Sequence, residues 1–200
     1  MDKKADLRVI RTRHMIKTAF LELMEEVGFT KVTVEGITRK AFISRNTFYL
    51  HYTDKYDLLN SLEEDVLLGL KEILKDMPFE IMKNKGLTEG KPISTLIKVY
   101  RYVSDNASFF SLMINDNGDP SFLHKLSETI RTILNSSIKG ELKIPQRYMI
   151  AIIVGIQTSI IGEWLRSGMK ETPEELAELI ASILESAPKN LLKAAEIIPL

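Results

Sequence analysis

The sequence predicts an all-α fold of about nine helices, and three observations lead to this prediction. Apolar residues recur at intervals of three and four along most of the 200 residues, the period of a helix with one buried face. The two-residue alternation that a half-buried strand requires is nearly absent. Hydrophobic residues make up 44% of the chain, which is enough to build a core.

The first two helices are expected in the N-terminal quarter of the chain. The first ends at Gly28, because glycine often terminates a helix. Thr33 is suited to cap a short second helix that ends near Ala41 or Phe42. The apolar stripe of the first helix is expected to consist of Ile16, Phe20, Leu23 and Val27.

A third, short helix and a long fourth helix follow directly. Ser44 can cap a third helix over 45–52. Thr53 is expected to start a fourth helix that ends before Pro78. The buried stripe of the fourth helix is predicted to consist of Leu59, Leu62, Val66, Leu70 and Ile73.

Five further helices are expected after a loop at 79–91, and turn signals separate them. The strongest turn signal is the run NDNGDP at 115–120. Thr172-Pro173-Glu174-Glu175 has the form of a capping box and opens the last helix, which is halted at Pro188. The other four are a helix that begins at Pro92, a short helix over the segment SFFSLMI, a helix that ends at about Lys139, and a helix from Gln146 to Gly168. We place two domains along this chain, at 8–68 and 69–200.

Composition points to a soluble cytoplasmic protein with no membrane partner. The chain has no cysteine, which excludes disulfides and thiolate zinc sites and suits a reducing compartment. The first 14 residues are charged rather than apolar, so we expect no secretory signal. The longest apolar stretch, 149–161, is shorter than the about 20 residues that a membrane span needs.

The charge distribution is mild evidence for a DNA-facing N-terminal end. The chain has no net charge overall, but residues 1–55 carry a net charge of +4 and residues 56–200 a net charge of −4. A basic segment on an acidic body suits an encounter with phosphates. A split of this size is also common on ordinary solvated surfaces.

The short second and third helices, preceded by a longer one, have the layout of a helix-turn-helix. In such a motif the last helix enters the major groove of DNA. Arginine can bond guanine, asparagine can bond adenine, and tyrosine can reach a phosphate or a thymine methyl. On a helical wheel, Asn46, Tyr49 and Leu50 share one half with Arg45, and Phe48 and Tyr52 occupy the other half. The wheel alone fits an ordinary polar surface helix equally well.

The run from Gly28 to Leu59 contains a specific set of residues: Gly28-Phe29, Thr33, the TFYLHY core of the third helix, and Lys55 followed by Leu58-Leu59. This run resembles the N-terminal DNA-binding domain of the TetR family of transcription regulators. The chain departs from the family pattern at Phe42, where most members have glycine. The detailed backbone of the turn between the second and third helices is therefore left open.

The resemblance implies a role in DNA binding for eight positions. It implies base contacts by Arg45, Asn46 and Thr47, phosphate contacts by Thr33, Tyr49, His51 and Lys55, and a thymine-methyl contact by Leu50. For His51 a purely structural role is the alternative. The resemblance also implies a homodimer on a near-palindromic double-stranded operator, controlled by a small-molecule or protein effector.

The helix expected at 146–168 is the candidate dimer surface, together with the helix at 173–187. Small residues at intervals of three and four let a second helix approach closely, and two helices from each subunit would form a four-helix bundle. The predicted interface comprises Ala151, Gly155, Ser159 and Gly162, with Leu176, Ile180 and Ile183. A core helix inside the monomer is the alternative.

Candidates for an effector pocket are the aromatic and methionine residues Tyr100, Phe109, Phe110, Met113 and Trp164. Stripes of this kind are more often core than pocket. The runs FFSLMINDNGDPSF and GEWLRSGMKETPEELA resemble the branch of the family that includes activators of dihydroxyacetone kinase operons. This resemblance widens the range of effectors to consider.

Two other classes of function compete with a DNA-binding regulator. An enzyme has no support, because the sequence shows no metal-ligand cluster, no phosphate-binding glycine loop and no paired carboxylates with a histidine. We expect no catalytic residue, metal or cofactor. An interaction module or activator that works through a protein partner is the alternative to a repressor.

Overall fold

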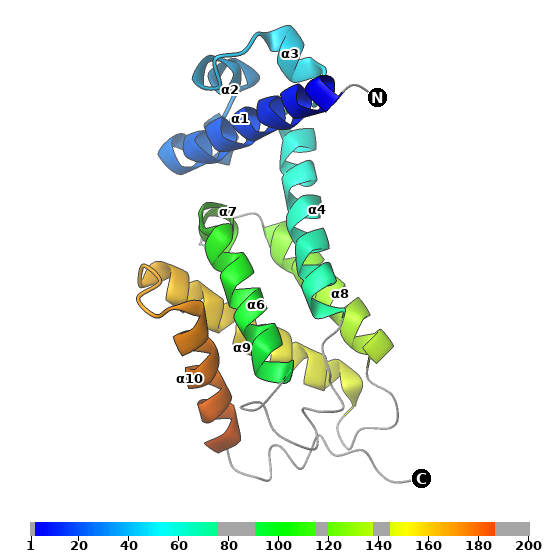
Figure 1. Cartoon of the computed structure of the whole chain (residues 1–200), viewed down its shortest axis with the longest axis vertical. Helices are drawn as coiled ribbons and strands as arrows, with labels where there is room; N and C mark the ends of the chain where they lie inside the picture. The colour runs from blue at the N-terminus through cyan, green and yellow to red at the C-terminus, as the bar shows by residue number, and fades with distance from the viewer. Residues whose placement is uncertain (1–2, 76–90, 115–119, 138–144, 187–200) are drawn as a thin grey trace. The chain divides into compact units, whose positions relative to one another are not determined.

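The computed structural model describes residues 3–75, 91–114, 120–137 and 145–186. Within these ranges the chain consists of nine α-helices and one short 3₁₀ helix without strands, which confirms the predicted all-α class (Figure 1). The chain divides into two compact units, residues 1–66 and 67–200, and the division falls inside the long helix α4. The sequence placed the boundary two residues later.

The N-terminal unit is built around α1. Ile16 and Phe20 of α1 are fully buried, and Met24, one turn further on, continues this buried stripe. Val27, expected in the stripe, is 42% exposed in the last turn of the helix. The helices of this unit are α1 (Lys3–Val27), the 3₁₀ helix η1 (Phe29–Lys31), α2 (Val34–Lys40), α3 (Arg45–Tyr49) and the first part of α4 (Lys55–Leu74).

Gly28 ends α1 as predicted. Its amide donates to the carbonyl of Met24 at 3.0 Å, and its backbone then turns to φ 77° and ψ 150°. An L side chain is strongly disfavoured in this conformation, whereas glycine adopts it without steric cost. The turn directs the chain into η1 and then to α2.

Side-chain caps set the start of each following helix. The Thr33 hydroxyl accepts from the Gly36 amide at 3.1 Å, and the Ser44 hydroxyl accepts from the Thr47 amide at 3.0 Å, which confirms both predicted caps. The start of α4 differs from the expectation, because Asp54 rather than Thr53 caps it. One Asp54 carboxylate oxygen accepts from the Tyr56 and Asp57 amides at 2.8 Å, and its negative charge is favourable at the N-terminus of the helix.

The C-terminal unit is a bundle in which α6 packs on α10, and α7 packs on α8 and α9 (Figure 1). The predicted capping box is present at the start of α10: Thr172 and Glu175 exchange backbone-to-side-chain hydrogen bonds at 2.8 and 3.2 Å. The helices are α6 (Lys91–Asp105), α7 (Ala107–Ile114), α8 (Pro120–Ser137), α9 (Gln146–Arg166) and α10 (Pro173–Ser186).

Two features hold the core of this unit. Phe109 and Phe110 of α7 and Phe122 of α8 pack edge to face, with ring centroids 5.2–6.2 Å apart. Gly69 lies against the ring of Tyr102, and a Cβ atom at this position would overlap the phenol. The absence of a side chain at Gly69 in α4 therefore makes room for the phenol of Tyr102 from α6.

Candidate nucleic-acid interface

The turn between α2 and α3 is a Schellman motif, the hydrogen-bonded form in which many helices end. The Phe42 amide donates to the Arg39 carbonyl at 3.3 Å, and the Ile43 amide donates to the Thr38 carbonyl at 3.0 Å. Phe42 has φ 54°, and its side chain is 90% exposed. The turn thus has the left-handed backbone conformation that glycine adopts most easily, although the residue here is phenylalanine.

The two faces of α3 are divided as the helical wheel predicts. Phe48 is fully buried and Tyr52 is 8% exposed, and their rings contact each other at 5.8 Å between centroids. Arg45 and Asn46 are exposed at the start of the helix. Tyr49 and Leu50 are 55% and 81% exposed. The helix itself ends at Tyr49, earlier than the predicted Tyr52, and Leu50 is its last capping position.

Two of the threonines assigned to DNA have local hydrogen bonds of their own. The Thr33 hydroxyl accepts from the Gly36 amide, so it can still donate to a phosphate. The Thr47 hydroxyl lies 2.9 Å from the Ser44 hydroxyl, and the Thr47 amide donates to the same oxygen. Thr47 is half-buried and forms part of the cap of α3.

His51 is half-buried directly after α3. Burial lowers the pKa of its imidazole below the usual 6.5, and the positive charge of Arg13 lowers this pKa further. The side chain is therefore mainly neutral at pH 7, and a neutral imidazole keeps one N–H for a hydrogen bond. This leaves His51 able to donate to a phosphate without carrying a positive charge in the free protein.

The resemblance implies a phosphate contact by Lys55, whereas in this structure the side chain of Lys55 is bonded within the chain. Its Nζ donates to the carbonyls of Phe29, Thr30 and Val32 at 3.0, 3.0 and 2.9 Å. The ammonium also lies over the Phe29 ring, 4.8 Å from its centroid. An ammonium has three N–H donors, and all three are used here. We therefore do not retain the Lys55 side chain among the proposed DNA contacts.

Arg45 is paired with an acidic residue that the sequence analysis did not single out. Its Nη2 donates to Oε2 of Glu35, in the first turn of α2, at 2.6 Å. The two side chains are 59% and 65% exposed. Glu35 lies ten residues before Arg45, so no local sequence pattern indicates the pair, which depends on the α2–α3 turn.

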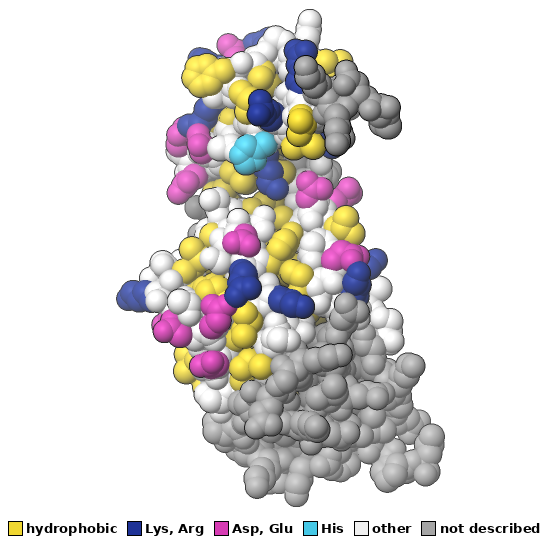
Figure 2. All heavy atoms as spheres, in the orientation of Figure 1, with side chains coloured by type: hydrophobic (Ala, Val, Ile, Leu, Met, Phe, Trp, Pro, Cys, Tyr) yellow, Lys and Arg dark blue, Asp and Glu magenta, His cyan; other side chains and the backbone are white. Residues whose placement is uncertain are grey.

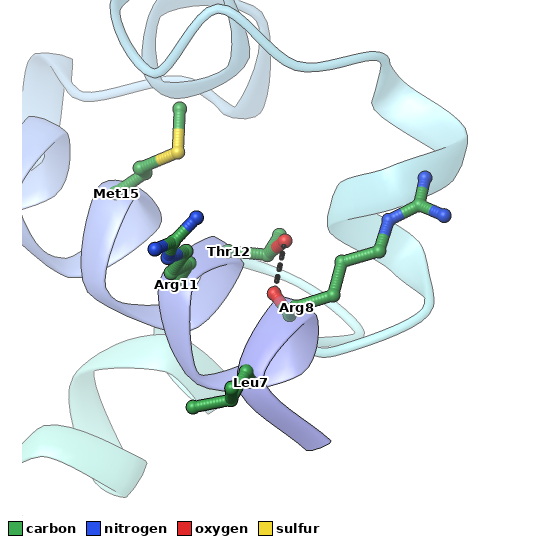
Figure 3. Close-up of a pocket in the computed structure, with 5 residues that line it drawn as sticks. All are labelled: Leu7, Arg8, Arg11, Thr12 and Met15. Atoms are coloured by element: carbon green, nitrogen blue, oxygen red, sulfur yellow. Dashed lines mark hydrogen bonds between the residues drawn. The ribbon is translucent and has the colours of Figure 1, made fainter. Parts of the chain in front are cut away.

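The exposed side of α1 contributes a hollow of about 390 Å³ (Figure 3). Its lining residues in the described part of the chain all come from this one helix, which is unlike the enclosed cleft of a small-molecule site. The lining residues are Leu7, Arg8, Arg11, Thr12 and Met15. The face shown in Figure 2 carries basic and acidic side chains close together, in keeping with a chain without net charge.

Two family models match the chain over complementary ranges. The model described as "Bacterial regulatory proteins, tetR family" matches residues 16–62, which contain α2 and α3. The model described as "Transcriptional regulator C-terminal region" matches residues 90–186. Together they cover most of the chain and both of its units.

The chain belongs to the TetR family of transcription regulators. A curated relative from Bacillus subtilis (strain 168), "Uncharacterized HTH-type transcriptional regulator YxbF", is 26% identical over 190 residues. The match covers 92% of this chain and 47% of the relative, so the chain spans about half the length of that protein.

Solved structures share the fold. The "Dihydroxyacetone kinase operon activator DhaS" is 20% identical, with a TM-score of 0.56, and the match covers 90% of this chain and 97% of that one. The regulator FadR from Bacillus subtilis, solved in complex with stearoyl-CoA, is 20% identical, with a TM-score of 0.52 and coverage of 88% and 98%. The resemblance of the C-terminal half to the dihydroxyacetone kinase branch stays a prediction.

The five effector candidates of this TetR family member lie in the core of its C-terminal unit. Each is at most 2% exposed, and Tyr100 packs edge to face on Trp164 at 6.0 Å between centroids. The Tyr100 hydroxyl donates to Oε1 of Gln157 at 2.9 Å, and burial raises the pKa of Tyr100 to about 12. Phe109, Phe110 and Met113 of α7 complete the set, and each is 1% exposed.

The predicted dimer surface separates into exposed and buried residues. Ala151, Gly155, Ser159 and Ile183 are exposed in the single chain. Gly162 is buried, as are Leu176 and Ile180, which are 5% and 6% exposed on the helix that packs against α6. Exposed apolar neighbours extend the first group: Ile152 (44%), Ile156 (37%) and Leu179 (48%).

Helix α9 is more apolar than its place at the surface of a single chain would suggest. In the described part of the chain, Arg147–Arg166 has the length and mean hydropathy, 1.5, of a helix that could cross a membrane, whereas the uninterrupted apolar stretch at 149–161 predicts a segment too short to do so. A core helix of a soluble protein meets the same criteria. In the described part of the chain only 22% of the apolar window is buried, and the residues that stay exposed include Ile152 and Ile156.

Proposed function

We propose that this TetR family protein is a sequence-specific DNA-binding regulator that binds a near-palindromic operator as a homodimer. The observation that carries the proposal is the exposed face of α3. It presents a guanidinium, an amide and a phenol from Arg45, Asn46 and Tyr49 on a capped helix-turn-helix. We assign no catalytic activity to it, and operator binding places the protein in the cytoplasm.

The chemistry of each exposed side chain suggests its partner. Arg45 suits the O6 and N7 atoms of guanine, and Asn46 suits the N6 and N7 atoms of adenine. Leu50, which is 81% exposed, offers an apolar contact for a thymine methyl. The remaining proposed contacts are to phosphates from Thr33, Tyr49 and His51, and to a base from Thr47, whose hydroxyl keeps capacity for a second hydrogen bond while it is bonded to Ser44.

Selection of bound fragments from genomic DNA tests the proposal and yields the operator. Arg45→Ala should then lose about 1–3 kcal/mol of operator affinity at one base position and relax the preference there. Arg131→Ala removes the same charge from α8, where the arginine pairs with Glu128, and should leave the preference intact. Failure to enrich any fragment, or equal preferences of wild type and Arg45→Ala, would contradict the proposal.

The uncovered apolar residues of α9 and α10 support a second copy of the chain as their cover. Ile152, Ile156 and Ile183 would otherwise remain in water, and a C2 arrangement buries the same patch on both copies. The small side chains at Ala151, Gly155 and Ser159 allow close approach of a facing helix. Such a dimer would place two α3 helices about 34 Å apart, one turn of B-DNA.

Effector control is the last part of the proposal. FadR binds stearoyl-CoA, and we infer that a ligand of this chain enters among the helices of the C-terminal unit, near Tyr100 and Trp164. Helix α4 runs from Lys55 to Leu74 through both units and is the continuous element that could carry a shift. Coupling must be reciprocal, typically about 5- to 150-fold, so ligand titrations with and without operator should differ by that factor.

Repression is the expected direction of control, with activation through a protein partner as the alternative. A reporter placed under a selected operator distinguishes the two. Loss of the protein should raise expression from the reporter if it represses and lower expression if it activates.

A further inference from the structure

Arg45 and Glu35 join the first turns of the two helices of the DNA-binding motif. Arg45 is the first residue of α3, and Glu35 is the second residue of α2, two positions after the Thr33 cap. Their side chains meet at 2.6 Å between Nη2 and Oε2. The carboxylate is thus held beside the guanidinium to which we assign the guanine contact.

The first turn of α2 is capped without this carboxylate. The cap of α2 is the Thr33 hydroxyl, and the hydrogen bond from the Thr38 hydroxyl goes to the backbone oxygen of Glu35. The Glu35 side chain is 65% exposed. An exposed carboxylate on a surface that approaches phosphates repels them, so its presence beside Arg45 weakens attraction to any DNA.

We propose that Glu35 is a specificity-determining residue that positions Arg45 and withholds it from phosphates; the inference rests on the proposed function. The guanidinium has five N–H donors, and the bond to Glu35 engages Nη2. Other N–H groups remain for the O6 and N7 atoms of a guanine. On DNA that lacks this guanine, phosphates are the groups that the Arg45 guanidinium can bind. The Glu35 carboxylate competes with these phosphates for the guanidinium.

Glu35→Gln tests this role, because it removes the charge and keeps the size of the side chain. Binding of the full chain is measured by fluorescence anisotropy, on a selected operator and on a scrambled duplex, across a salt series. The variant should bind the scrambled duplex about two- to fivefold more tightly, the range an exposed ion pair can supply. The slope of log affinity against log salt should steepen by about 0.9 for each Arg45 that gains a phosphate. The preference for operator should fall.

Glu26→Gln is the matched control. Glu26 pairs with Lys40 at 2.6 Å, is 55% exposed, and carries the same charge in the same unit. This variant should keep the wild-type preference. Glu35→Asp restores the charge and should return the preference toward that of the wild type, and circular dichroism shows that each variant is folded.

A double variant identifies the group through which Glu35 acts. In an Arg45→Ala background, Glu35→Gln should no longer steepen the salt dependence on scrambled DNA. Equal effects of Glu35→Gln and Glu26→Gln, or an undiminished effect without Arg45, would overturn the inference and leave the proposed function standing. A wild-type protein that binds operator and scrambled duplex equally would overturn both.

Discussion

Phe42 and Gly168 occupy the same position in two copies of one motif. Each is the first residue after the C-cap of a helix that ends in a Schellman motif, and each has a positive φ, 54° and 81°. The amides after them bond back to Thr38 and Trp164 at 3.0 and 2.8 Å. The motif requires a left-handed residue, and an L side chain there is strained by about 1–2 kcal/mol.

Phe42→Gly should therefore stabilise the protein. The Phe42 ring is 90% exposed, so its removal loses little packing. Relief of strain outweighs the extra freedom that glycine gives the unfolded chain, and we expect a net gain of about 0.5–1 kcal/mol. Denaturant unfolding followed by circular dichroism measures it. Phe42→Val, with a branched Cβ atom, should shift the midpoint the other way; a loss of stability with glycine would mean that the ring packs on something.

We expect His51 to make DNA binding depend on pH. Burial and then Arg13 lower its pKa below 6.5 in the free protein, whereas a bound phosphate would raise it. Operator binding should therefore take up protons, and affinity should rise as the pH falls from 8 to 6, by less than about tenfold per unit for each His51. Anisotropy at matched ionic strength measures this slope. His51→Gln should flatten it, and His14→Gln, on the exposed surface of α1, should not.

The same pKa shift has an opposite consequence for folding. The unfolded chain binds a proton at His51 near pH 6.5, and the folded protein binds it only at lower pH. The contribution of His51 to the free energy of unfolding is fully present above pH 6.5 and is lost as the pH falls through the lowered pKa. Stability and operator affinity should thus respond to acid in opposite directions at this one residue.

At the scale of elements, the local signals in the sequence were sufficient for most helix starts and ends. Gly28, Thr33 and Ser44 act within four residues of themselves, so their roles follow from the sequence alone. Contacts that depend on tertiary structure were out of reach. Lys55 bonds carbonyls 23 to 26 residues earlier, and Arg45 meets Glu35 only because the turn brings α2 and α3 together.

Lys55 ties the start of α4 to the segment between α1 and α2. Lys55→Met keeps the length of the side chain and removes all three donors, so the three hydrogen bonds to the carbonyls of Phe29, Thr30 and Val32 are lost. We expect a loss of about 1–3 kcal/mol in the free energy of unfolding. The salt dependence of DNA binding should keep its slope, because we assign no phosphate contact to the ammonium. Lys31→Met, at an exposed position of η1, is the control for charge.

A decrease of about 0.9 in the salt slope of Lys55→Met, with unchanged stability, would restore the phosphate contact that the family resemblance implied. The two results separate a lysine that shapes the motif from one that touches DNA. Weaker DNA binding alone would not separate them, since a loosened η1 also displaces the Thr33 cap.

At the scale of the whole molecule, the apolar pattern of α9 predicted a buried helix but could not show which faces meet the same chain. Periodicity marks a residue as apolar without naming its neighbour. Ile150 and Trp164 are buried within the C-terminal unit, whereas Ile152 and Ile156 are exposed on its surface. The same ambiguity affects α10, where the apolar pattern groups Leu176 and Ile180 with Ile183 although only Ile183 is exposed.

Gly155→Leu distinguishes a partner-covered face from a free one. A Cβ atom at Gly155 meets nothing within 4 Å, so leucine fits the single chain and improves the helix by up to about 1 kcal/mol. Against a second copy it would overpack the interface by about 1–3 kcal/mol, which weakens dimerisation about 5- to 150-fold. Sedimentation measured over a dilution series should show this change, and Thr132→Leu, exposed on α8, should not. A Gly155→Leu protein that dimerises as tightly as the wild type would exclude this stripe from the interface.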